Sequence, residues 1–242
     1  MKILVALFVY NERPYLSSFI NYYKSHGCEL LFVDNCSTDG TYEYLLKRGI
    51  KVTQLDTKES FQLRLLQDEL TIQIKKAKPD WVVYTGADLY YSFDDTITET
   101  IKKADQEGYN QIAVQCISAM NTGEEFKRPI QNTYFYGILQ KELVMISKYE
   151  DGFFIIADSI KIPNPKVKVV PGIVINYGAC KPIPEQKIKL QRRQKAWDEG
   201  MHKGWGTHYL SHETRQWCWT KGELIYFPDS NIWKYLQKII TK

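Results

Sequence analysis

Hydrophobic and polar positions follow a regular order through the first half of the chain, with short apolar runs separated by longer amphipathic stretches. Short apolar runs indicate strands buried on both faces of a sheet. They fall at Ile3–Val9, Leu30–Val33, Val52–Leu55, Trp81–Tyr84 and Gln111–Ile117. Helical periodicity, interrupted by Gly or Pro, predicts helices over Pro14–His26, Tyr42–Arg48, Ser60–Lys76 and Thr96–Gln106. This alternation predicts an α/β fold, with a mixed, mainly parallel sheet flanked by helices.

The second half of the chain is less regular after Gly123. Pro129–Leu139 and Lys166–Gly178 have strand-like patterns, whereas Ile183–Gly200 and Ser230–Ile240 have helical ones. No linker rich in Gly, Ser or Pro separates the halves. We therefore predict one compact domain, residues 1–242, in which residues 123–242 complete a site begun by residues 1–122.

The apolar N-terminus, MKILVALFVY, superficially resembles a signal peptide. The chain continues as NERPY with no small-residue cleavage pattern, so a buried strand explains the run better. No segment approaches the ~20 apolar residues that span a bilayer. The five cysteines are scattered and form no CxxC pair, which argues against a zinc site or a disulfide framework. We expect a cytoplasmic protein, at most peripheral to the membrane.

Polar clusters follow three of the expected strands. They are Tyr10-Asn11-Glu12, Asp34-Asn35 and Gly86-Ala87-Asp88. In parallel sheets ligands bind beyond the carboxyl ends of the strands, so the three clusters predict one ligand crevice. The net charge of +4, from 32 basic and 28 acidic residues, is too mild to indicate nucleic-acid binding.

The segments FVYNERPYL and LLFVDNCSTDGTYEYL resemble the start of a family 2-type glycosyltransferase with the GT-A fold. In that family the first strand ends in Asn-Glu, and the second in Asp-Asn-x-Ser-x-Asp-Gly-Thr, which Asp34 to Thr41 match. A D-x-D-type motif follows the fourth strand, here WVVYTGADLYY. The resemblance covers roughly Met1 to Phe93. It implies transfer of a sugar, with inversion, from a nucleotide-diphosphate sugar to the hydroxyl of a glycan, lipid-linked or protein acceptor.

The residue types at the first two strand ends fit a nucleotide-sugar donor. Asp34, beside Asn35, can accept a hydrogen bond from a base N–H, and Glu12 can accept from base or ribose groups. Phe8 and Tyr10 can cover the base, since aromatic rings stack on bases with about 1–3 kcal/mol each.

The stretch Val33–Thr41 can also be explained as a capped turn. Asp39 and Thr41 are expected to cap the following helix, whose N-terminus favours a nearby anion. The clusters around Asn11 and Asp88 nevertheless favour a ligand role for Asp34.

Asp88 is expected to hold Mg²⁺ or Mn²⁺ against the donor phosphates, since these cations prefer oxygen ligands. The cation would stabilise the leaving diphosphate as a Lewis acid. Gly86 stands where the family has a carboxylate. The cation is therefore held by Asp88 with phosphates and water, or a second ligand comes from the C-terminal half, where we favour His208. Asp94 and Asp95 are expected to cap the next helix.

The residues for two further roles, a diphosphate contact and a catalytic base, have more than one explanation or candidate. The resemblance implies a diphosphate contact at Arg64, although a solvated helix face explains this residue equally well. Transfer needs a base for the acceptor proton, which the family takes from an aspartate. Asp151, in a Glu-Asp pair, and Asp158 are the two candidates.

Two amphipathic segments of the second half also allow several explanations. The basic one can clamp the diphosphate, dock on an anionic membrane, or form a solvated helix. The terminal helix can meet a membrane or pack on the core. The first carries Lys181, Lys187, Lys189, Arg192, Arg193 and Lys195, and the second Ile232, Trp233, Leu236 and Ile240.

Two other functions are compatible with the pattern. Because Gly86 stands where the family has a carboxylate, the chain is also compatible with a degenerate member that binds a sugar nucleotide or glycan without turnover. A nucleotidyltransferase would need a Gly-rich, basic phosphate loop after the first strand, and the chain has Tyr10-Asn11-Glu12-Arg13 there.

Overall fold

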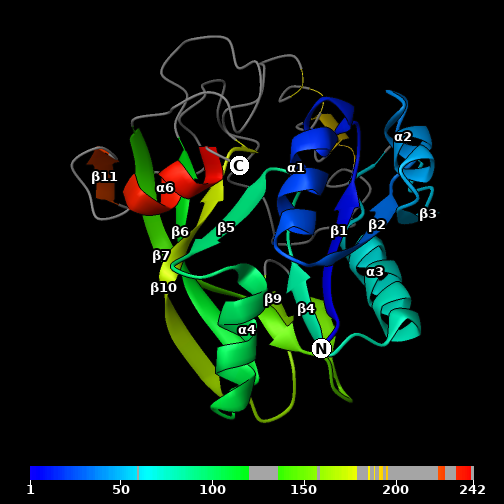
Figure 1. Ribbon diagram of the computed structural model, residues 1–242. Coiled ribbons are helices and arrows are strands. Elements are labelled where there is room, and N and C mark those ends of the chain that lie inside the picture. Colours follow the sequence, from blue (N-terminus) through cyan, green and yellow to red (C-terminus); the bar gives the residue numbers. More distant parts are fainter. Residues whose placement is uncertain are drawn as a thin grey trace.

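The computed structural model of the chain describes residues 1–58, 60–119, 136–156, 159–178, 185, 188, 191–192, 195, 223–226 and 233–240 (Figure 1). The helices are α1 (Arg13–Ser25), α2 (Thr41–Lys47), α3 (Leu63–Ala77), α4 (Ile97–Gln106) and α6 (Trp233–Ile240). The strands are β1 (Ile3–Val9), β2 (Glu29–Asp34), β3 (Lys51–Gln54), β4 (Trp81–Tyr84), β5 (Leu89–Phe93), β6 (Gln111–Ala119), β7 (Tyr136–Lys148), β8 (Phe154–Ile156), β9 (Ser159–Lys161), β10 (Val167–Asn176) and β11 (Glu223–Tyr226).

One mixed sheet runs through the molecule in the order β3-β2-β1-β4-β7-β6-β10-β5, with β11 paired to β7. Strands β3, β2, β1 and β4 are mutually parallel. Strand β7 is antiparallel to β4 and β6, whereas β10 is parallel to β6. The predicted α/β class with flanking helices is confirmed, and the second half of the chain supplies strands to the same sheet.

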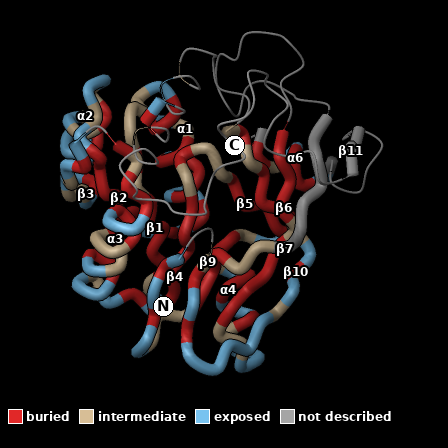
Figure 2. The backbone as a smooth tube through the Cα atoms, turned by 180° about the vertical axis from the view of Figure 1, so that it is seen from behind, coloured by how far each residue is buried: buried red, intermediate tan, exposed pale blue. Residues whose placement is uncertain are grey.

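The register of the parallel strands brings their carboxyl ends to one edge. Val9 lies opposite Asp34, and Asp34 lies opposite Gln54. Strand β4 pairs with β1 up to Tyr84. The buried strands form the core, and the outer faces of the helices are exposed (Figure 2). The apolar N-terminal run is the buried strand that the sequence predicted.

Helix boundaries depart from the predictions where polar side chains satisfy the backbone. Helix α4 begins after Thr96, whose hydroxyl accepts from the Glu99 N–H at 3.2 Å while the Glu99 carboxylate accepts from the Thr96 N–H at 3.1 Å. Thr96 is therefore the cap. The prediction for Asp94 and Asp95 was wrong, because these side chains pair with Lys234 and Lys103.

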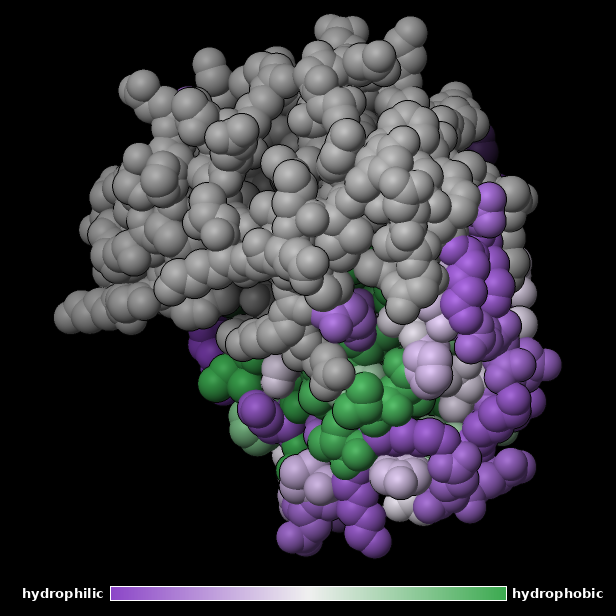
Figure 3. All heavy atoms as spheres, turned by 90° about the vertical axis from the view of Figure 1, so that its left-hand side faces the viewer, coloured by the Kyte–Doolittle hydropathy of each residue, from purple (hydrophilic) through white to green (hydrophobic). Residues whose placement is uncertain are grey.

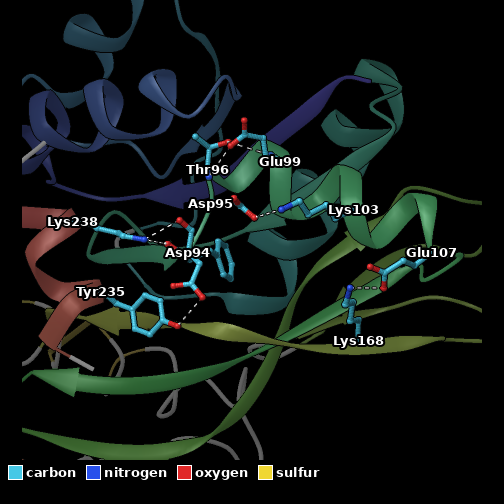
Figure 4. Close-up of polar contacts among 10 residues, drawn as sticks. Asp94, Asp95, Thr96, Glu99, Lys103, Glu107, Lys168, Tyr235 and Lys238 are labelled. Atoms are coloured by element: carbon cyan, nitrogen blue, oxygen red, sulfur yellow. Dashed lines mark hydrogen bonds and ion pairs between the residues drawn. The ribbon is translucent and has the colours of Figure 1, made fainter. Parts of the chain in front are cut away.

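The terminal helix α6 packs on the core (Figure 4). Leu236 is buried, and Lys238 Nζ donates to the carbonyls of Phe93 at 2.8 Å and Asp94 at 2.9 Å. The hydrogen bond from Lys234 lowers the pKa of Asp94. Of the two explanations given for the terminal helix, Leu236 therefore agrees with packing on the core. Ile232 lies outside the described residues, and the side chains of Trp233 and Ile240 are not among those described.

The described surface also carries apolar side chains. Val167 and Val169 at the start of β10 are 41% and 57% exposed. Figure 3 shows a hydrophobic area between hydrophilic residues on the face that it presents. Within the described parts of the chain, no helix has both the length and the apolar character needed to cross a bilayer.

Candidate functional site

The three polar clusters predicted from the sequence lie at the same edge of the sheet. The Asn35 N–H donates to the Val9 carbonyl at 2.9 Å, and the Leu55 N–H donates to the Asp34 carbonyl at 2.9 Å. The Thr85 N–H donates to the Ala6 carbonyl at 3.2 Å. These backbone bonds hold the loops after β1, β2, β3 and β4 against one another.

The loop after β2 is tied to the loop after β1 through Asn11. Asn11 has a positive φ of 53°, a conformation that Asn tolerates better than most residues. Its N–H donates to Ser37 Oγ at 2.9 Å, and its Oδ1 accepts from the Thr38 N–H at 2.8 Å. The Asn11 side chain, predicted to bind the donor, is engaged by this loop.

The end of the same loop caps the helix that precedes it in the chain. Asp39 Oδ2 accepts from the Arg13 N–H at 2.9 Å, and Thr41 Oγ1 accepts from the Glu12 N–H at 3.0 Å. Gly40 precedes α2 and provides no side-chain cap. Asp39 Oδ1 also accepts from the N–H of Thr41, the first residue of α2, at 3.0 Å, so the predicted contact of Asp39 with the following helix is confirmed. The prediction was wrong for Thr41, whose hydroxyl accepts from the Glu12 N–H instead.

Asp34 is fully enclosed at the end of β2. Its Oδ2 accepts from the Ser37 N–H at 3.0 Å and from Gln54 Nε2 at 3.3 Å. Its Oδ1 is shielded from solvent and has no hydrogen-bond partner among the residues that the structure describes. A buried acceptor without a hydrogen-bond partner costs about 1–3 kcal/mol of folding free energy, so Asp34 Oδ1 calls for a functional explanation.

Asn35 belongs to a buried polar network behind Asp34. With its amide oriented to satisfy both ends, its nitrogen donates to Thr57 Oγ1 at 2.7 Å and to the Leu55 carbonyl at 3.0 Å. Its oxygen then accepts from Arg192 Nη2 at 2.7 Å. Asn35 and Thr57 are 3% and 2% exposed.

Arg192, from the basic segment that the sequence singled out, lies against this network. Its guanidinium carbon lies 3.3 Å from the centroid of the Tyr10 ring, and its side chain is buried. Lys195 Nζ donates to the Lys58 carbonyl at 2.7 Å. Arg192 is therefore buried against this network and does not lie on a solvated helix face. The other basic residues predicted in this region, Lys181, Lys187, Lys189 and Arg193, lie outside the described residues.

Aromatic rings line the site beside Tyr10. The ring of Phe8 lies 6.0 Å from that of Phe61 and 6.4 Å from that of Tyr84, measured between centroids. Phe8 is only partly buried, so this group presents a ring to the crevice. Tyr10 is also partly buried.

Asp88 lies between two glycines at the end of β4. A Cβ on Gly86 would lie 2.8 Å from Asp88 Oδ1, and one on Gly178 would lie 3.1 Å from Asp88 Oδ2. A side chain at either position would push the carboxylate away. In this arrangement Gly86 leaves room for the Asp88 carboxylate, which would have to shift if residue 86 had a side chain.

The turn after β10 adjoins Asp88. The Tyr177 N–H donates to the Asp88 carbonyl at 2.9 Å. The Asn176 Oδ1 accepts from the Gly178 N–H at 2.7 Å, and a Cβ on Gly178 would lie close to both Asn176 Oδ1 and Asp88 Oδ2. The C-terminal half thus brings an amide oxygen into the turn that adjoins Asp88. Among the described residues, no three His, Cys, Asp or Glu side chains converge on a metal position, and His208 lies outside them.

Tyr15 of α1 contacts Glu185. Its hydroxyl donates to Glu185 Oε2 at 2.8 Å. Burial raises the pKa of Tyr15 well above its ordinary value, and the hydrogen bond and negative charge of Glu185, with the charges of Glu12 and Asp88, raise it further. We missed Glu185 in the sequence, although it lies seven residues before Arg192, on the same face of a helix.

The structure does not bring two predicted residues to the site. Arg64 Nε lies 3.0 Å from Asp68 Oδ1, and its side chain is 62% exposed, as on a solvated helix face. Asp151 lies in an exposed turn beyond β7, where Lys148 pairs with Trp81 at the amino end of β4. The edge that carries Asp34 and Asp88 is at the other end of that strand. Asp158 lies outside the described residues.

The fold is an α/β domain, and its polar clusters lie at the carboxyl edge of parallel strands, where such sheets bind ligands. The sequence pattern of glycosyl transferase family 2 matches residues 5–160, and the chain belongs to this family. No curated protein matches the chain in sequence.

Several solved structures resemble the chain. S. aureus TarS is 21% identical over 52% of this chain and 23% of its own, with a TM-score of 0.39. TarS 1–349 in complex with UDP-GlcNAc is 22% identical over 52% of this chain and 37% of its own, also at 0.39. Glucosyl-3-phosphoglycerate synthase from Mycobacterium tuberculosis, in complex with Mn²⁺, UDP and glucosyl-3-phosphoglycerate, is 19% identical over 48% of this chain and 44% of its own, at 0.34. The chain thus spans less than half the length of each of these structures.

Proposed function

We propose that the protein transfers a sugar from a nucleotide-diphosphate sugar to an acceptor hydroxyl with inversion at the anomeric carbon. Membership of glycosyl transferase family 2 supports this activity. The observation that carries it is the enclosed Asp34, whose Oδ1 has no partner among the described residues at a strand end flanked by the Tyr10 and Phe8 rings. A base held by the rings would offer its N–H to that oxygen.

The chemistry of Asp34 restricts the base. Uracil and guanine carry a ring N–H on their pairing edge, whereas cytosine and adenine carry a ring lone pair there. A carboxylate attracts the first pair and repels the second, and a hydrogen bond to a charged group contributes about 1.5–3 kcal/mol. We therefore expect a UDP- or GDP-sugar donor.

The residues at the end of β4 fit a divalent cation. Asp88 offers a carboxylate in a space kept open by Gly86 and Gly178, and Asn176 offers an amide oxygen in the adjoining turn. Mg²⁺ binds to one or two carboxylates plus substrate phosphates, and Mn²⁺ accepts the same oxygen ligands. Bound there, the cation would act as a Lewis acid toward the diphosphate.

Direct displacement needs a base near the acceptor. The acceptor oxygen bonds to the anomeric carbon as the carbon–oxygen bond to the diphosphate breaks, and the diphosphate leaves with the bonding electrons. The acceptor proton passes to a carboxylate. Asp158 is a candidate from the sequence. Glu185 is a second candidate, since the Tyr15 hydroxyl of α1 holds its carboxylate at 2.8 Å.

A non-catalytic member that only binds a sugar nucleotide is the second candidate. The single carboxylate in Gly86-Ala87-Asp88 favours it.

Binding and turnover distinguish these functions. Thermal stability of the wild-type protein would be measured with UDP, GDP, CDP and ADP, because ligands that bind only the folded state raise it. Hydrolysis of UDP- and GDP-sugars would then be followed with Mn²⁺ or with chelator.

We expect UDP or GDP to stabilise the protein, and Asp88→Ala to lower Mn²⁺-dependent turnover about 100-fold, on the scale of other lost transition-state contacts. Asp68→Ala, a partly exposed carboxylate on α3, is the control and should leave turnover unchanged. Nucleotide binding without turnover would support the binding-only function. No stabilisation by any nucleotide would contradict both.

A further inference from the structure

Arg192 lies where the proposed donor base would stack. Its guanidinium carbon is 3.3 Å from the centroid of the Tyr10 ring, which is the spacing of two stacked planar groups. The side chain is only 8% exposed, so this contact is enclosed rather than a passing surface encounter. Tyr10 is the ring that we expect to cover the base.

Hydrogen bonds of the Arg192 side chain and backbone hold the guanidinium against the Tyr10 ring. Its Nη2 donates to the Asn35 side-chain oxygen at 2.7 Å and lies 3.4 Å from the Ser60 carbonyl. The Arg192 carbonyl accepts from the Phe61 N–H at 3.2 Å. Because Asn35 directly follows Asp34, the guanidinium bridges the Tyr10 ring and the end of β2.

The surroundings of Asp34 agree with this placement. Its Oδ1 is closed to solvent, so a base cannot reach it unless a covering group moves. The charge of Arg192 also acts on Cys36, two residues after Asp34. Burial, Asp56 and Asp34 raise the pKa of the Cys36 thiol, and Arg192 opposes that rise. Arg192 therefore lies close to the loop that begins at Asp34.

We propose that Arg192 is an intramolecular competitor of the donor base. One face of an aromatic ring accommodates one planar group, so Arg192 and a base that stacks on the same face of Tyr10 exclude each other. This inference rests on the proposed function, since it needs a nucleotide at Tyr10. Donor binding then displaces Arg192, and the affinity for the donor is reduced by the stability of the Arg192 contacts.

The competition is measured with nucleosides. Uridine and guanosine carry no phosphate, so attraction between Arg192 and a diphosphate does not enter. A cation–π contact of ordinary strength corresponds to a 3- to 30-fold change in affinity, roughly. Arg192→Ala should therefore bind the preferred nucleoside about 3- to 30-fold more tightly in calorimetry. Arg192→Lys, which keeps the charge but loses the planar group, should bind more tightly than wild type by a smaller factor.

Lys195→Ala is the matched control. Lys195 belongs to the same segment and bonds to the Lys58 carbonyl, on the same loop as Ser60. Its removal should leave nucleoside affinity unchanged. Weaker nucleoside binding by Arg192→Ala than by wild type would overturn the proposal, because Arg192 would then be a partner of the base.

A second measurement uses the wild-type protein. Phenylglyoxal modifies accessible guanidinium groups, and mass spectrometry of peptides reports the modification of Arg192. Saturating uridine or guanosine should speed the modification, and an unchanged or slower rate would overturn the proposal even if the variants did not fold. If wild type and variants bound neither nucleosides nor UDP and GDP, the proposed function itself would be wrong.

Discussion

The ends of β2 and β4 each carry an aspartate at the same edge of the sheet, but the two carboxylates have opposite surroundings. Asp34 is enclosed, with Oδ2 bound by Ser37 and Gln54 and Oδ1 closed to solvent. Asp88 is partly buried and lies between Gly86 and Gly178.

The different surroundings of the two carboxylates suit two different kinds of ligand. An enclosed carboxylate with one orientation can accept from one N–H at one position, which suits a flat base. A carboxylate in an open space between glycines can shift toward a cation and phosphates. Under the proposed function, the same residue type would select the base at β2 and neutralise charge at β4.

The largest effect that would sharpen the comparison is expected at Asp34. Asp34→Asn keeps an oxygen for the Ser37 N–H but turns N–H groups toward the base. Nucleotide affinity should fall about 10- to 100-fold, equivalent to a lost hydrogen bond to a charged group. Calorimetry with UDP and GDP measures it. Asp56→Asn, an exposed carboxylate beyond β3, is the control, and an equal loss in both variants would refute a specific role for Asp34.

Gly86 tests the open space at β4. Gly86→Ala should lower Mn²⁺-dependent turnover about tenfold, because displaced catalytic groups act less well. Gly86→Asp restores the carboxylate that the family pattern has, yet it should be no more active, since its Cβ also displaces Asp88. Kinetics over a range of Mn²⁺ concentrations provide the measurement. A gain of activity in Gly86→Asp would show that position 86 simply lacks a ligand.

Asp39 tests the structural part of the loop after Asp34. Asp39→Ala removes the acceptor of the Arg13 N–H at the start of α1. The loss of such a cap costs about 0.5–2 kcal/mol of unfolding free energy, measured by urea unfolding. Asp39→Ser should retain part of it. Nucleotide affinity should stay unchanged in both, and a loss there would place Asp39 in the binding site.

The smallest effect is expected at the amino edge of the sheet. Lys148 Nζ donates to Asp105 Oδ1 at 2.8 Å and lowers the pKa of Asp105. A carboxylate with a lowered pKa stabilises the fold above its unfolded-state pKa, and this contribution disappears as pH falls through the folded-state value. Asp105→Asn should cost less than about 1 kcal/mol at pH 7, as for exposed ion pairs. The difference from wild type should shrink as the pH falls below the unfolded-state pKa of Asp, and vanish below the lowered folded-state pKa of Asp105. A constant difference across pH would exclude the ion pair as its source.

Local pattern predicted the parallel half of the fold. The runs at Ile3–Val9 and Trp81–Tyr84 match β1 and β4, because burial on both faces leaves a continuous apolar signature. Strand β5, Leu89–Phe93, was missed as a separate element, since it follows β4 after a short turn. Helix α3 begins at Leu63 rather than Ser60, because Thr57, Ser60 and Gln62 form a buried hydrogen-bonded turn.

The sequence by itself determined the parallel strands β1 to β4 and the edge at which Asp34 and Asp88 lie, because strand periodicity and the residues that follow a strand are local properties. Only the tertiary structure brought Arg192 to Ser60, 132 residues away, and Glu185 to Tyr15, 170 residues away. It also placed Asp151 at the far edge and Asp88 against Gly86 and Gly178. Such contacts depend on packing between distant segments, and no periodicity along the chain records them.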